Sequence, residues 1–104
     1  MREADLQDAL EQWLDLFGYE WFHDRAVNKT HINRPGFPDL VAAHPLTGAV
    51  LFLELKSAKR PLTPAQHRWR SALERSKVIY RLVYPDDLDA TIALLRAQAG
   101  KDRG

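Results

Sequence analysis

The segment 49–56 constrains the fold of this chain more than any other part of its sequence. Three leucines at alternate positions point to one side of an extended segment, and Val50 and Phe52 point to the other side. Apolar side chains on both faces are typical of a strand that is covered on both sides of its sheet. We therefore expect a central, buried strand. Turn residues at 44–48 predict that it pairs with a short strand at 39–43 as an antiparallel hairpin.

Glu54 and Lys56 interrupt this apolar strand, and their spacing of two residues places both side chains on one face. Burying a carboxylate and an ammonium group costs on the order of several kcal/mol unless each is paired or bound to a metal ion. If Asp39 pairs opposite Glu54, two carboxylates lie side by side and repel each other. A divalent cation, Mg²⁺ or Mn²⁺, would remove that repulsion. The alternative is a structural ion pair between Glu54 and Lys56, with Asp39 as a turn residue.

Proline and glycine residues divide the rest of the chain into elements. The expected order is helix 3–17, strand 19–23, loop 24–38, strand 39–43, strand 49–56, helix 63–77, strand 78–84 and helix 85–100. This order predicts an α/β fold (α+β, one small mixed sheet). A chain of 104 residues has room for one domain, here 1–100 with a tail at 101–104.

The helix at 63–77 begins with a strong start signal. Thr63 suits the N-cap, Pro64 the first helical position and Gln66 the third position of a capping box. The capping role accounts for Gln66 by itself. Gln66 also leans toward the sheet, where it could contact a metal-bound water or a phosphate. The residues expected to face inward are Ala65, Trp69, Ala72 and Leu73.

Glu3 is the acid of the first helix that points the same way as the apolar stripe. At about 100° per residue it lies within about 20° of Leu10. The other acids of this helix point elsewhere. We expect Glu3 to reach a metal site at the end of the sheet. The alternative is an acid that favours the helix dipole in the first turn.

The sequence does not support a cysteine-based site, a histidine metal site, a membrane span or a signal peptide. The sequence has no cysteine, which excludes disulfides, cysteine–zinc sites and cysteine nucleophiles. The histidines have no metal-ligand spacing and are expected on the surface or in loops; they are His23, His31, His44 and His67. An apolar run long enough to cross a membrane is absent, as is a signal-peptide pattern, so the expected location is the cytoplasm of a bacterial or phage-infected cell.

Charge is distributed unevenly although the formal net charge is only +1. Segment 1–24 carries seven acids and one base, whereas segment 56–81 carries eight bases and one acid. A local basic block indicates a polyanionic partner such as nucleic acid. The alternative is a solvated helix face.

These motifs together resemble the VRR-NUC domain, the virus-type replication-repair branch of the PD-(D/E)XK nuclease superfamily. The resemblance rests on Glu3, on Gly-Phe-Pro-Asp at 36–39, on Glu-Leu-Lys at 54–56, and on Leu-Thr-Pro-Ala-Gln at 62–66 followed by Trp69. It extends to about Leu95 and implies a restriction-endonuclease-like αβββαβ core. The linker 57–61 and the positions 76–77 lack the glycines that are usual in the family.

The resemblance implies a metal-dependent endodeoxyribonuclease. Its metal ligands for Mg²⁺ or Mn²⁺ would be Glu3, Asp39, Glu54 and the main-chain carbonyl of Leu55. Lys56 would orient or help to deprotonate the attacking water, and Gln66 would support the site. Stand-alone members of the family resemble homodimeric enzymes that act on branched DNA such as Holliday (four-way) junctions.

The basic residues provide the expected contacts with DNA phosphates. These residues are Arg25, Lys29, Arg34, Lys59, Arg60, Arg68, Arg70, Arg75 and Lys77. Phosphate contacts carry no sequence code, so we expect structure-selective binding that weakens steeply with salt. Two other functions remain open: a nuclease of the same fold that cuts nicked, flap or duplex DNA, and a non-catalytic nucleic-acid-binding module.

Overall fold

The computed structural model describes residues 1–24, 35–58 and 60–101 of the chain. Its elements are α1 (Glu3–Leu16), β1 (Glu20–His23), β2 (Leu40–Ala43), β3 (Val50–Leu55), α2 (Pro64–Glu74), β4 (Ile79–Val83), the 3₁₀ turn η1 (Pro85–Asp87) and α3 (Leu88–Gln98). The strands form one sheet in the order β1-β2-β3-β4. The pairs β1–β2 and β2–β3 are antiparallel and β3–β4 is parallel, which confirms the mixed α+β sheet.

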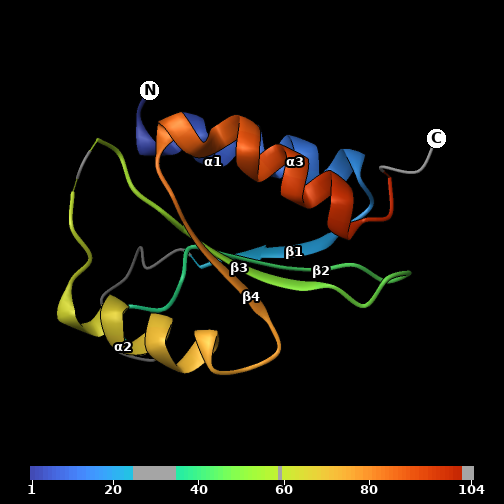
Figure 1. Cartoon of the computed structure of the whole chain (residues 1–104). Helices are drawn as coiled ribbons and strands as arrows, with labels where there is room; N and C mark the ends of the chain where they lie inside the picture. Colours follow the sequence, from blue (N-terminus) through green and yellow to red (C-terminus); the bar gives the residue numbers. More distant parts are fainter. Residues whose placement is uncertain (25–34, 59, 102–104) are drawn as a thin grey trace.

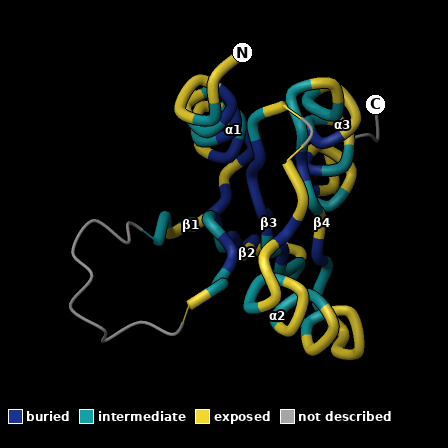
Figure 2. The backbone as a smooth tube through the Cα atoms, turned by 90° about the vertical axis from the view of Figure 1, so that its left-hand side faces the viewer, coloured by how far each residue is buried: buried dark blue, intermediate teal, exposed yellow. Residues whose placement is uncertain are grey.

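Strand β3 is central, as expected from its two apolar faces. It lies between β2 and β4, with α1 and α3 over one face of the sheet and α2 on the other (Figure 1). The three leucines of β3 are at most 1% exposed and pack against leucines of α1 and α3. Figure 2 shows these buried stretches facing one another between α1, α3 and the sheet. The main core therefore lies on one face, and the face with Glu54 is left for the site.

Helix α2 begins as predicted and ends earlier than predicted. The Oγ1 atom of Thr63 accepts from the Gln66 backbone N–H, and the Gln66 Oε1 atom accepts from the Thr63 N–H, which completes the capping box. The helix ends at Glu74 instead of residue 77, because the Ser76 hydroxyl donates to the carbonyl of Leu73 at 2.7 Å.

The packing of α2 is looser than expected. None of its residues is fully buried, and Ala72, expected to face inward, is exposed. The contact that anchors the helix is Trp69 against Phe37, with ring centroids 4.9 Å apart. The small side chain of Ala72 lies outside this contact and remains exposed to water. The prediction for Ala72 is therefore wrong.

His44 lies in the predicted turn, as expected, but its side chain is buried, with 3% exposure. Its Nδ1 atom faces the backbone N–H groups of Leu46 and Thr47, at 3.2 and 3.4 Å, and so accepts from them. Its Nε2 atom then carries the proton and donates to the Phe17 carbonyl at 2.9 Å. The ring joins the turn to the end of α1, a long-range contact that no sequence spacing reveals.

Several other predictions fall on parts of the chain outside the description. They concern Arg25, Lys29, His31, Arg34 and Lys59, and the tail beyond Lys101. None of the helices in the described residues is long and apolar enough to cross a membrane.

Gly36 allows the loop before β2 to approach α2, and this contact can be tested. A Cβ atom at Gly36 (φ +84°) would lie 2.4 Å from the backbone carbon of Ala65, whereas one at Gly48 (φ +76°) would meet nothing within 4 Å. Gly48→Ala should cost about 1 kcal/mol of unfolding free energy through backbone strain alone. Gly36→Ala should cost at least about 2 kcal/mol more because α2 must move. Urea denaturation measures both; equal losses would contradict the close approach.

Candidate active site

The end of β3 brings Asp39 and Glu54 together. Leu40 pairs with Leu53, so one further step of the same register places Asp39 opposite Glu54. The Oδ2 atom of Asp39 accepts a hydrogen bond from the Leu55 backbone N–H at 2.7 Å, which fixes the carboxylate against the strand. Glu54 is 3% exposed on the face that α2 covers.

This environment disfavours the charged form of Glu54. Burial raises the pKa of Glu54 to about 9, and the charge of Asp39 and a hydrogen bond to its carboxyl group act in the same direction. The Lys56 charge lowers this pKa in part, and the Glu3 charge raises it slightly. The site thus concentrates negative charge that one nearby lysine does not balance.

Gln66 connects the start of α2 to this carboxylate. Its Oε1 atom is held by the Thr63 N–H at 2.8 Å, so its Nε2 atom must point the other way. That atom donates to Glu54 Oε2 at 3.0 Å. The two roles expected for Gln66, helix capping and support of the site, therefore coexist in one side chain.

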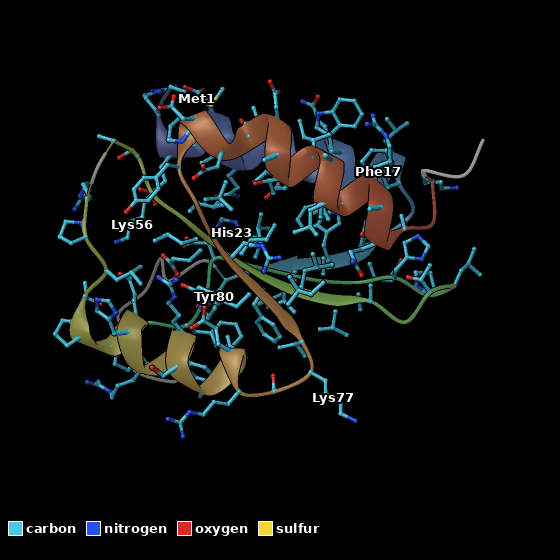
Figure 3. All side chains as sticks on the ribbon, in the orientation of Figure 1. Met1, Phe17, His23, Lys56, Lys77 and Tyr80 are labelled. Carbon is cyan, nitrogen blue, oxygen red and sulfur yellow. The ribbon has the colours of Figure 1, made fainter. Side chains whose placement is uncertain are left out.

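Glu3 and Lys56 complete the group at the end of β3. The Oε2 atom of Glu3 accepts from the Ser57 backbone N–H at 3.3 Å, so α1 reaches just past the strand. Lys56 is 8% exposed, and its backbone N–H donates to the Val83 carbonyl at 3.0 Å. Figure 3 shows Lys56 at this end of β3, between the start of α1 and the start of α2.

The oxygen donors fit a divalent cation in type, although they do not form a three-ligand cluster. In the described part of the chain, no group of three or more His, Cys, Asp or Glu side chains is arranged to hold a metal ion. Asp39 and Glu54 are adjacent, whereas Glu3 is turned toward the Ser57 backbone. One buried oxygen, Glu54 Oε1, accepts no hydrogen bond from a described residue. Hard carboxylate oxygens of this kind suit Mg²⁺ or Mn²⁺.

Comparison with known proteins agrees with this geometry. The family model of the VRR-NUC domain matches residues 2–86. This chain belongs to the VRR-NUC domain family. A solved structure described as a VRR_NUC domain superposes with a TM-score of 0.69 at 20% identity, covering 89% of this chain and 96% of that one. A search of curated proteins finds no match. Membership gives this VRR-NUC chain a nuclease-type fold and indicates DNA as its partner.

The basic residues of this VRR-NUC domain differ in their surroundings. Arg68 and Arg75 are exposed and line an open hollow of about 510 Å³ on α2, with His67, Ser71 and Ala72. Arg68 also borders a second hollow of about 460 Å³ beside Pro35 and Trp69. Arg60 and Lys77 are exposed as well.

Arg70, unlike Arg68 and Arg75, makes contacts within the protein. Its Nε atom pairs with Glu74 Oε2 at 3.2 Å, and its guanidinium lies 5.8 Å from the ring centroid of Tyr80. Arg70 is therefore engaged within the protein, and Arg68 and Arg75 are better placed to meet a phosphate.

Sequence reasoning missed Tyr80 and a polar cluster on α1. Tyr80 is 5% exposed, and burial followed by the Glu54 charge raises the pKa of its hydroxyl to about 12. The signal in the sequence was the polar ring of Tyr80 in the largely apolar strand β4. The pairing of β4 with β3 places this ring on the Glu54 face of the sheet. On α1, Gln7 Nε2 lies 2.6 Å from Glu11 Oε2 and 2.7 Å from His23 Nδ1. This cluster joins residues 16 positions apart, Gln7 and His23, which spacing alone does not connect.

The raised pKa of Glu54 predicts how stability depends on pH. Its folded value of about 9 exceeds the ordinary value of 4.5, so between these values the folded protein retains a proton that the unfolded chain has lost. In EDTA, this contribution to stability is complete below about pH 4.5 and disappears as the pH rises toward 9. Glu54→Gln keeps a neutral group at the same place. It should therefore flatten the decline and raise Tm at alkaline pH.

Thermal melts in EDTA across this pH range provide the measurement. Glu20→Gln, at an exposed position on β1, is the matched control and should follow the unaltered protein. Parallel Tm curves for the unaltered protein and Glu54→Gln would contradict the raised pKa.

Proposed function

We propose that this chain is a metal-dependent endonuclease that hydrolyses phosphodiester bonds in DNA, with branched DNA such as four-way junctions as the favoured substrate. The observation that carries the proposal is the pairing of the Asp39 and Glu54 carboxylates at the buried end of β3, two residues before Lys56. Burying these groups is unfavourable unless a positive ligand neutralises them. Family membership supports the same chemistry.

The residues that would hold Mg²⁺ or Mn²⁺ are Asp39 and Glu54, with Glu3 and the Leu55 main-chain carbonyl as further donors. A bound divalent ion lowers the pKa of a coordinated water and neutralises charge that develops on the phosphate. Lys56 orients the attacking water and stabilises the phosphate oxygens, since it is the nearby cation that acts on Glu54. Gln66 holds the Glu54 carboxylate in place through its hydrogen bond.

DNA binding rests on charge. Arg68 borders a hollow beside Pro35, in the loop that leads to Asp39, so a phosphate backbone bound there would approach the site. Arg75 borders a second hollow farther along α2. A homodimer would supply two symmetric sites for the two equivalent strands of a junction. Nicked, flap or duplex DNA, and binding without cleavage, are the alternatives that the assay below separates.

Cleavage assays on a labelled four-way junction and a matched linear duplex test the proposal. Cutting should require Mg²⁺ or Mn²⁺, stop in EDTA and favour the junction. Lys56→Ala should lower the cleavage rate by about 100-fold or more, because a preorganised charge next to the phosphate is lost. Junction binding should change little in this variant.

Lys101→Ala removes an exposed lysine that follows Gly100, which lies beside Thr47 in the β2–β3 turn at the other end of β3 from Glu54, and serves as the control. Full activity of Lys56→Ala would remove this residue from the mechanism. Equal cutting of both substrates would retain the nuclease and discard junction preference. Tight junction binding with no cutting would favour the non-catalytic module.

The exposed arginines of α2 should account for part of the affinity for DNA. The double variant Arg68→Ala/Arg75→Ala should weaken junction binding and reduce the slope of log K against log salt by about 2, since each lost phosphate contact removes about 0.9. Arg96→Ala/Lys101→Ala changes the net charge equally at exposed positions near α3 and should leave the slope unchanged. Equal effects of the two double variants would place the DNA elsewhere on the protein.

A further inference from the structure

Two buried oxygen atoms beside the site have no hydrogen-bond partner. Among the described residues, Glu54 Oε1 and the hydroxyl of Tyr80 are the buried side-chain atoms in this condition. Glu54 is 3% exposed and Tyr80 is 5% exposed. Buried polar groups are almost always satisfied by protein or by ordered water, so two unpartnered atoms in one region require an explanation.

The two side chains face the same interior space. In the parallel pairing of β3 and β4, Tyr80 lies beside Phe52, and Leu82 lies beside Glu54, so both polar side chains are on the α2 face of the sheet. Figure 3 shows Tyr80 between β4 and α2. The Glu54 charge raises the pKa of Tyr80, second only to burial, so the hydroxyl lies within electrostatic reach of that carboxylate. With a pKa of about 12 the hydroxyl stays protonated and can donate.

Arg70 holds the Tyr80 ring in place. Its guanidinium carbon lies 5.8 Å from the ring centroid, a distance that suits a cation–π contact. Glu74 Oε2 fixes the same guanidinium through its Nε atom at 3.2 Å. The hydroxyl therefore extends from a ring that Arg70 covers, and it is itself buried.

We propose that Tyr80 is a positioning residue for Glu54: its hydroxyl donates to a buried water molecule, and Glu54 Oε1 accepts from that water. A water is the natural bridge because no described group donates to Glu54 Oε1 or pairs with the Tyr80 hydroxyl, and a buried water needs at least two polar partners. A carboxylate oxygen has two lone pairs, so Oε1 can accept from the water and still face a cation.

The consequence concerns the orientation of the carboxylate. Gln66 already donates to Glu54 Oε2 at 3.0 Å, so the proposed bridge gives each oxygen of Glu54 a fixed donor. Donors that orient a metal ligand in this way commonly affect metal affinity by about tenfold or more. The link to metal binding rests on the proposed function, whereas the hydrogen bond itself does not.

Tyr80→Phe removes only the hydroxyl and keeps the ring under Arg70. The matched control is Tyr19→Phe. Tyr19 is 4% exposed and donates to the Leu95 carbonyl at 2.6 Å, on the opposite face of the sheet. Two measurements are made on each full-length variant: Tm in EDTA, and Mn²⁺ affinity by calorimetry in the absence of DNA. Tyr80→Phe should lower Tm and weaken Mn²⁺ binding about tenfold. Tyr19→Phe should lower Tm alone.

The sign of the Tm shift decides whether the hydroxyl is bonded. An unbonded buried hydroxyl is unfavourable, so an unchanged or raised Tm in Tyr80→Phe would overturn the proposal. A lowered Tm with unchanged Mn²⁺ affinity would overturn the positioning role. If the unaltered protein binds no Mn²⁺, the metal-dependent function fails, and the Tm shift still decides the hydrogen bond from Tyr80.

Discussion

The burial of Glu54 beside Asp39 is the constraint on which the rest of the site depends. Burial, and then the neighbouring Asp39 charge, raise the pKa of Glu54 and so disfavour its charged form when no cation is bound. The surrounding contacts keep the two groups in place. Leu55 donates to Asp39 through its backbone, and Gln66 donates to Glu54 from the first turn of α2. The fold thus maintains an arrangement that is unfavourable for the folded protein alone and favourable for a positively charged ligand.

Much of the fold follows from the sequence because its signals are local. Alternation of apolar residues identified β3, turn residues identified the β2–β3 hairpin, and the capping residues located the start of α2. The pairing of Asp39 opposite Glu54 was a condition that the sequence left open, and the register of the antiparallel hairpin meets it. The predicted end of α2 was less accurate, since a serine side chain, not a glycine, meets the Leu73 carbonyl in its last turn.

The remaining features depend on contacts between distant parts of the chain. His44 is buried because it meets the Phe17 carbonyl, 27 residues away in sequence. Tyr80 lies on the same face as Glu54 because β4 pairs in parallel with β3, a relation that neither strand encodes by itself. Glu3 was expected to reach the end of the sheet, and its carboxylate accepts there from the Ser57 backbone N–H, a contact that sequence spacing does not specify. A helical wheel gives the direction of a side chain but not the distance to which it reaches.

One strand performs two tasks because side chains alternate along it. The leucine face of β3 packs with α1 and α3 and supplies stabilisation, while its other face carries Glu54, the proposed metal ligand. A shift of register by one residue would exchange the two faces and bury the acid in the leucine core, at a cost far above that of its present position. The core and the site therefore constrain each other: the leucines fix the register, and the register fixes which carboxylates meet.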